Sequence, residues 1–123
     1  MQSEDYNQLM NITIKATDID LTAPLKAYIE DKIGGLERFL KRIDADTVKT
    51  QVEVGRDSKH HQKGDVYRAE VNIELPDGML RAEVTDWDVR VAIDSVRDKL
   101  RREIEKYLDS HGKEHRGDDP VQE

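Results

Sequence analysis

Two segments of alternating apolar and polar residues, 67–75 and 80–85, flank a Pro-Asp-Gly sequence at residues 76–78. Alternation with a period of two places every second side chain on the same face of a β-strand. Proline and glycine between the two segments favour a tight reversal of the chain. The sequence therefore predicts a β-hairpin with one apolar face, and another layer of structure must cover this face.

Two further segments, 10–17 and 48–54, show the same alternation and predict two more half-buried strands. A polar loop at residues 56–65 separates the second predicted strand from the hairpin. This loop is long for a connection between neighbouring strands, and long surface loops are often functional.

Helical spacing of apolar residues marks two other segments. The first helix begins after Thr22, a residue type that caps helix N-termini. Its apolar stripe consists of Leu25, Ile29, Ile33, Leu36 and Leu40. Gly34 and Gly35 interrupt this helix and predict a kink, because each glycine costs about 1 kcal/mol relative to alanine. The second helix spans residues 88–107, with a stripe of Val89, Ala92, Ile93, Val96, Leu100, Ile104 and Tyr107.

The resulting order of elements, β-α-β-β-β-α, belongs to the α+β class. We predict a four-stranded antiparallel sheet with both helices packed on one face. The length of 123 residues fits a single domain. We expect a flexible N-terminal extension at residues 1–9, a folded domain at residues 10–108 and a flexible acidic tail at residues 109–123.

The last predicted helix carries six Lys and Arg residues, although the net charge of the chain is −7. At about 100° per residue, these cations fall on both sides of the apolar stripe. The first basic flank consists of Lys99, Arg102 and Lys106. The second basic flank consists of Arg90, Arg97 and Arg101. An acidic ridge between the flanks consists of Asp94, Asp98 and Glu105.

Charge alone favours a solvated helix with ion pairs, such as one between Asp98 and Arg102 at i,i+4. A local cationic patch can nevertheless bind an anion, because screening confines charge effects to about 10 Å at moderate salt. The aromatic residues are too scattered to form a base-stacking platform, and we expect Tyr28, Tyr67 and Tyr107 in the core. RNA contacts would therefore involve phosphates and shape.

Catalytic and metal-binding motifs are absent from the sequence. Without a phosphate-cradling glycine loop, a nucleophile elbow or an HExxH motif, we expect neither an enzyme nor a small-molecule substrate. His60 and His61 are adjacent in a loop, and His111 and His115 lie in the tail, so we expect no metal and no other cofactor. The lack of cysteine fits a reducing cytoplasm. No apolar run has membrane-spanning length, so we expect no membrane partner.

The sequence between residues 10 and 107 resembles the ribosome hibernation-promoting factor / ribosome-associated inhibitor family, whose members are also labelled sigma-54 modulation proteins. The resemblance is to the short form of the family. The matching stretches are residues 10–14 with 21–22, residues 31–39, residues 64–71 with 80–83, and residues 92–106. The run that holds Lys99, Arg102 and Lys106 is the most specific of them.

The resemblance implies a fold similar to a double-stranded-RNA-binding domain and a monomer when free. Family members bind the small ribosomal subunit and its RNA at the decoding region. They occupy the sites of messenger and transfer RNA and silence translation under stress or in stationary phase. Short forms either help to pair ribosomes or leave them as inactive monomers, and the resemblance is compatible with both outcomes.

Carried over by position, the resemblance assigns RNA binding to the first basic flank and to Lys32 and Arg38 of the first helix. It also matches Arg81 in the fourth strand to a basic or polar position of the family. Lys63 in the polar loop is added by its charge alone, and the second basic flank could assist. Two alternative functions would involve a different partner. One is a protein-binding transcriptional modulator that uses the acidic ridge or a sheet face. The other is a free-standing double-stranded-RNA-binding module.

Overall fold

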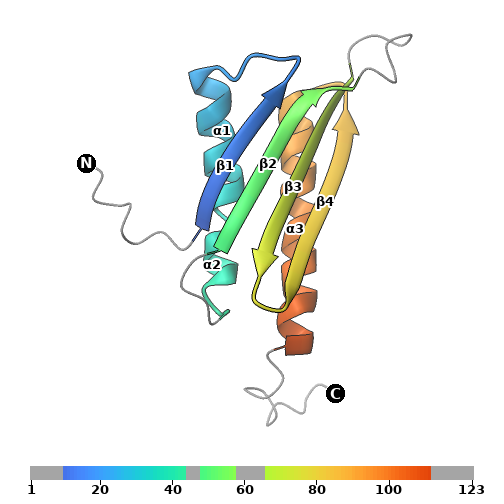
Figure 1. Ribbon diagram of the computed structural model, residues 1–123. Coiled ribbons are helices and arrows are strands. Elements are labelled where there is room, and N and C mark those ends of the chain that lie inside the picture. The colour runs from blue at the N-terminus through green and yellow to red at the C-terminus, as the bar shows by residue number, and fades with distance from the viewer. Residues whose placement is uncertain (1–9, 44–47, 58–65, 112–123) are drawn as a thin grey trace, which may run out of the picture.

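The computed structural model describes residues 10–43, 48–57 and 66–111, with only the backbone of His111. Within these residues the chain forms four strands and three helices (Figure 1). In chain order they are β1 (Met10–Thr17), α1 (Ala23–Gly34), α2 (Glu37–Leu40), β2 (Val48–Arg56), β3 (Tyr67–Leu75), β4 (Gly78–Asp86) and α3 (Val89–His111). The predicted order and the α+β class are confirmed, with the first helix divided in two. The similarity to a double-stranded-RNA-binding domain stays a prediction.

The strands form one sheet in the order β1-β2-β3-β4. β2 and β3 pair antiparallel, as do β3 and β4, which confirms the predicted hairpin. β1 and β2 instead pair in parallel, so the prediction of a wholly antiparallel sheet is wrong. The physical reason is that α1 and α2 carry the chain back along the sheet, and such a helical crossover lets two strands run in the same direction.

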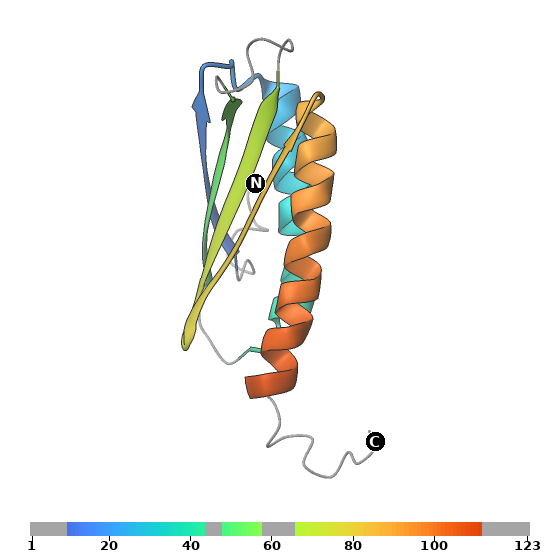
Figure 2. The same cartoon turned by 90° about the vertical axis from the view of Figure 1, so that its right-hand side faces the viewer.

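The three helices lie on one face of the sheet, and no described helix covers the other face, which we call the open face (Figure 2). Ile29 and Ile33 of α1 and Val96 and Leu100 of α3 are almost completely buried between the layers. They share one hydrophobic core with inward-facing strand residues such as Val71. The prediction of helices on one face is therefore confirmed, and the outer sides of α1, α2 and α3 form a continuous layer that a partner could contact.

α1 begins where the sequence predicts. The hydroxyl oxygen of Thr22 accepts a hydrogen bond of 3.2 Å from the backbone N–H of Leu25. Pro24 lies in the first turn, where a helix needs no N–H donor. The helix ends at Gly34, and the chain forms the short helix α2 from Glu37 onwards. The predicted interruption at the two glycines is thus confirmed.

α3 follows β4 after a short turn. The side chain of Asp88 accepts a hydrogen bond of 2.9 Å from the backbone N–H of Arg90, which satisfies a donor at the helix start. α3 continues to His111, beyond the domain boundary predicted at residue 108. The predicted extension at residues 1–9 and the rest of the predicted tail, residues 112–123, lie outside the described residues.

Candidate nucleic-acid interface

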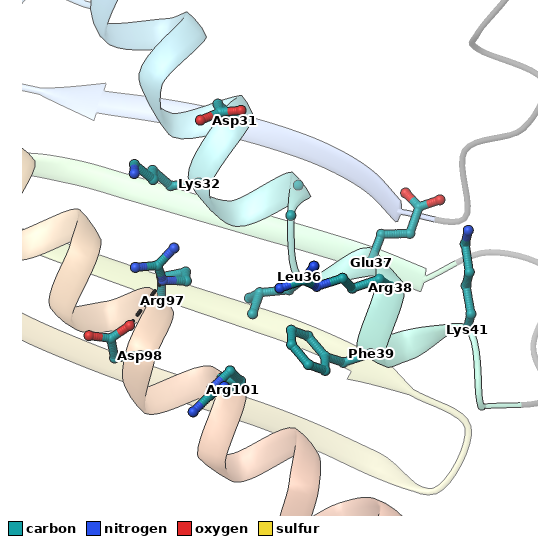
Figure 3. Close-up of a pocket in the computed structure, with 12 residues that line it drawn as sticks. Asp31, Lys32, Leu36, Glu37, Arg38, Phe39, Lys41, Arg97, Asp98 and Arg101 are labelled. Atoms are coloured by element: carbon teal, nitrogen blue, oxygen red, sulfur yellow. Dashed lines mark hydrogen bonds and ion pairs between the residues drawn. The ribbon is translucent and has the colours of Figure 1, made fainter.

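A groove lies between α1 and α2 on one side and α3 on the other (Figure 3), and we call it the inter-helix groove. Its volume is about 630 Å³. It is lined by Asp31, Lys32, Gly34, Gly35, Leu36, Glu37, Arg38, Phe39, Lys41, Arg97, Asp98 and Arg101. Five of these residues are cationic and three are acidic, so the groove is locally positive in a chain whose net charge is −7.

The break between α1 and α2 shapes this groove. Because α1 ends at Gly34, the chain can turn before α2 begins, and Gly35 adds no side chain to the groove wall. Leu36 is completely buried and anchors the start of α2 on the core. Arg38 and Phe39 are thereby placed beside α3, and Figure 3 shows the Phe39 ring directed from α2 towards α3.

Tyr28 of α1 links α1 to α3. Its hydroxyl donates a hydrogen bond of 2.8 Å to Oδ1 of Asp94. This hydrogen bond, together with a smaller effect of burial, raises the pKa of Tyr28 above its ordinary value of 10.0. Nζ of Lys32 and the guanidinium carbon of Arg90 lie 5.4 Å and 5.0 Å from the centroid of the Tyr28 ring. Both distances allow cation–π attraction.

Phe39 of α2 has a similar environment. The guanidinium carbons of Arg38 and Arg101 lie 5.0 Å and 5.9 Å from the centroid of its ring. The ring is half-buried and packs against the hydrophobic core. Each of the two rings thus has two cations beside it. One comes from α1 or α2, and the other comes from the second basic flank of α3.

The acidic ridge predicted on α3 lies partly inside the groove. Asp94 is bonded to Tyr28, and Asp98 lines the groove with its Oδ1 3.0 Å from Nε of Arg97. The structure therefore pairs Asp98 with Arg97 and not, as predicted, with Arg102. Asp98 is 57% exposed, and its partner is the preceding residue of α3 itself.

The first basic flank lies on the other side of α3, next to β4. Nζ of Lys99 donates a hydrogen bond of 3.4 Å to the backbone carbonyl oxygen of Glu83. Nζ of Lys106 lies 3.7 Å from Oε2 of Glu103, and Arg102 is exposed. The predicted RNA-binding residues of the first helix are therefore brought together with the second basic flank, and the first basic flank forms a separate surface.

Arg81 lies apart from both surfaces, on the open face of the sheet. Its Nη2 is 2.7 Å from Oε2 of Glu70. Arg68 also contacts Glu70, at 2.6 Å, and Glu83, at 3.1 Å. The hydrogen bond from Arg68 is the main cause that lowers the pKa of Glu70. Arg68 and Arg81 on the open face are therefore both paired with carboxylates, which leaves Arg81 less available to an outside anion.

The structure also adds residues that the sequence-based set of RNA-binding residues lacks. Lys41 lines the groove, and Tyr28 and Phe39 contact its cations. The i,i+4 spacing of Tyr28 and Lys32 is a sequence signal for contact on a helix. The contact of Phe39 with α3 depends on tertiary packing, which no local pattern predicts. Lys63 lies outside the described residues.

The described residues offer neither of two other kinds of site. In residues 10–43, 48–57 and 66–111, no three His, Asp or Glu residues gather closely enough to hold a metal ion. No helix in the same part of the chain is long and apolar enough to span a membrane. His60, His61 and His115 lie outside the described residues.

Comparison with known proteins gives one family. The family model described as "Sigma 54 modulation protein / S30EA ribosomal protein" matches residues 12–111. The ribosome hibernation promotion factor of Bacillus subtilis is 36% identical over 99 residues, which are 80% of this chain and 48% of that protein. The protein of the same name from Deinococcus radiodurans is 30% identical over 94 residues, 76% of this chain and 47% of that protein. The chain thus spans about half the length of these curated relatives.

Two solved structures share the fold. The N-terminal domain of Thermus thermophilus Protein Y has a TM-score of 0.63 at 24% identity, and the match covers 80% of this chain and 97% of that chain. A ribosomal subunit interface protein from Coxiella burnetii has a TM-score of 0.59 at 19% identity, with 78% and 94% covered. Because the family model matches residues 12–111, which is well over half of the chain, the chain belongs to the sigma 54 modulation protein / S30EA ribosomal protein family.

Proposed function

We propose that the chain is a non-enzymatic ribosome-binding factor that acts in ribosome hibernation in the cytoplasm. Its folded domain binds the small ribosomal subunit at the decoding region and blocks the sites of messenger and transfer RNA under stress or in stationary phase. Membership of the family and the name shared by its relatives, ribosome hibernation promotion factor, support a ribosomal partner.

The observation that carries this proposal is the inter-helix groove. Its five cations come from α1, from the α2 region and from α3, and they converge in one concavity of an acidic chain. Cations outnumber acids by five to three along this groove, and a local excess of one charge attracts ligands of opposite charge. RNA phosphates that enter the groove would release their counterions, which favours binding at low salt. Such contacts position a partner on the RNA backbone without reading bases.

The first basic flank is proposed as a second, weaker RNA contact. Lys99, Arg102 and Lys106 lie on an exposed side of α3, outside the lining of the inter-helix groove. Arg81 is expected to contribute least, because it is paired with Glu70 on the opposite face of the sheet. The helical layer therefore faces the RNA in this proposal, and the open face of the sheet is directed away from it.

Two variants with matched charge test this assignment. The groove variant replaces Lys32, Arg38 and Arg101 by Gln. The flank variant replaces Lys99, Arg102 and Lys106 by Gln, and it removes the same number of positive charges. Binding of each variant to purified small subunits is measured by co-sedimentation over a range of salt concentrations, and urea unfolding confirms that both variants are folded.

We expect the groove variant to bind much more weakly than the flank variant at every salt concentration. Each lost phosphate contact should also lower the slope of log affinity against log salt by about 0.7–0.9. Equal binding by the groove variant and the unaltered chain would contradict the assignment of the groove. Tighter binding to plain duplex RNA than to small subunits would favour a free-standing double-stranded-RNA-binding module, and salt-insensitive binding to a protein partner would favour a transcriptional modulator.

A further inference from the structure

We propose that Tyr28 and Phe39 are positioning residues whose rings hold four cations in place before RNA binds. Three of these cations line the inter-helix groove, and the fourth, Arg90, lies at the Tyr28 ring outside the groove lining. The inference rests on the proposed function, because it assumes that these cations meet phosphates. It gives a positioning role to two uncharged residues. The pattern of cations in the sequence does not indicate this role.

The geometry of the two rings carries the inference. Lys32 and Arg90 lie at the Tyr28 ring, and Arg38 and Arg101 lie at the Phe39 ring, all within 6 Å of a ring centroid. Both rings are themselves held in place. The hydroxyl of Tyr28 is bonded to Asp94, and both rings pack against the hydrophobic core. A fixed ring can therefore restrain a long, flexible cationic side chain.

The four cations at the rings differ from three other arginines of the described chain in what holds them, whereas Arg56 also lies near a ring, 6.0 Å from the centroid of Tyr67. Arg68, Arg81 and Arg97 are paired with carboxylates. Within the part of the chain that the structure describes, no carboxylate is paired with the side chain of any of the four cations at the rings. A ring attracts the cation through its π face and leaves the N–H donors unused, whereas a carboxylate accepts them. The rings can thus order these side chains and keep their donors available for phosphate.

Ordering before binding has an energetic consequence. Lys and Arg side chains have many rotamers, and a side chain that must be immobilised during association weakens the affinity. If the rings hold the cations in advance, these side chains are already partly immobilised in the free protein, and binding loses less affinity by ordering them. Removal of the ring should therefore weaken binding even though every positive charge remains in the chain.

Paired substitutions separate the ring from the bulk of the side chain. Phe39→Leu removes the π face and keeps an apolar side chain, and Phe39→Tyr keeps the ring. At the other site, Tyr28→Leu removes the ring. Tyr28→Phe keeps the ring but removes the hydrogen bond to Asp94. Affinity for purified small subunits is measured over a range of salt concentrations, with urea unfolding as the control for folding. If one Leu variant does not fold, the other pair makes the same test.

We expect Phe39→Leu to weaken binding by roughly ten-fold, because two arginines lose their restraint. The slope of log affinity against log salt should change by less than the value of about 0.7–0.9 that one lost phosphate contact gives. Phe39→Tyr should restore the affinity to within about two-fold, since its ring still attracts the cations. Unchanged binding by Phe39→Leu, or equally weak binding by Phe39→Tyr, would overturn the inference.

A double-mutant cycle distinguishes positioning from direct stacking of Phe39 on a base. If the ring acts through Arg101, the losses from Phe39→Leu and Arg101→Gln should be less than multiplicative when combined. The same cycle with Lys99→Gln, on the other side of α3, should be multiplicative. Fully multiplicative losses in both cycles would overturn the inference and leave the proposed function standing. Failure of the unaltered chain to bind small subunits would overturn both.

Discussion

Replacement of Arg68 by methionine should destabilise the fold in a pH-dependent way. Glu53, Glu70 and Glu83 occupy directly opposed positions on β2, β3 and β4, where like charges repel. Nη1 of Arg68 lies 2.6 Å from Glu70 and 3.1 Å from Glu83, and its Nη2 lies 3.9 Å from Glu53. Methionine keeps an unbranched apolar side chain over the sheet but leaves the three carboxylates without their shared cation.

The expected magnitude follows from the burial of these contacts. The side chain of Glu70 is 12% exposed and that of Arg68 is 31% exposed. A hydrogen bond between charged groups in such a setting contributes about 1.5–3 kcal/mol. The more exposed contacts with Glu83 and Glu53 contribute under about 1 kcal/mol each. We therefore expect Arg68→Met to lower the free energy of unfolding by about 2–3 kcal/mol at pH 7.

The pH dependence has a definite sign. The hydrogen bond from Arg68 holds the pKa of Glu70 below its ordinary value of 4.5. Because the folded pKa is the lower one, this stabilisation is complete above pH 4.5 and is lost as the pH falls through the folded pKa. In Arg68→Met the hydrogen bond is gone, and burial favours the protonated carboxyl group. The difference in stability between the two proteins should therefore shrink in acid.

Urea unfolding at pH 7 and at about pH 3 measures this difference. Arg81→Met is the matched control, because Arg81 has one contact with Glu70 and its side chain is 61% exposed. Its loss should stay under about 1 kcal/mol at pH 7. The reasoning would be refuted if Arg68→Met lost as much stability at pH 3 as at pH 7, or no more than Arg81→Met at pH 7.

Two further predictions concern close packing and titration. Gly55→Ala should lower the free energy of unfolding by about 1–3 kcal/mol in urea, because a Cβ there would lie 2.6 Å from the carbonyl oxygen of Thr17. Gly78→Ala is the control, since its Cβ would meet nothing within 4 Å, and equal losses would contradict the steric argument. Asp94→Asn should lower the pKa of Tyr28 towards 10.0 in an ultraviolet titration, because the hydrogen bond to the Asp94 carboxylate is the main cause that raises it. An unchanged Tyr28 pKa would show that burial, and not this bond, is responsible.

Local patterns predicted most of the fold because side-chain periodicity follows directly from backbone geometry. The alternation at residues 67–75 and the turn at residues 76–78 correspond to β3, β4 and their connection. The glycines at 34 and 35 correspond to the break between α1 and α2. The direction of β1 relative to β2 was predicted wrongly, because the same alternation fits parallel and antiparallel pairs. Only the helical connection between the two strands decides it.

The features of the candidate site that depend on spacing along one helix were predictable from the sequence. The features that depend on how the helices pack against each other were not. Spacing on α3 separated its cations into two flanks, and the structure keeps that separation. No local pattern shows which flank faces the first helix, since both flanks border the same apolar stripe. Lys32 and Arg38 therefore lie beside Arg97 and Arg101, although the resemblance to the family had drawn attention to Lys99 and its neighbours. The bond between Asp94 and Tyr28 depends on the same packing.

The central claim is that the inter-helix groove binds RNA of the small ribosomal subunit. The chain contains no cysteine, so a single introduced cysteine can carry a photoreactive label at one chosen position. Lys41→Cys places the label at the groove, and Lys49→Cys places it on the open face of the sheet. After irradiation in complex with small subunits, we expect Lys41→Cys to crosslink to ribosomal RNA at the decoding region and Lys49→Cys to give little RNA crosslinking. Crosslinks to RNA from Lys49→Cys alone, or from Lys41→Cys to protein alone, would contradict the account.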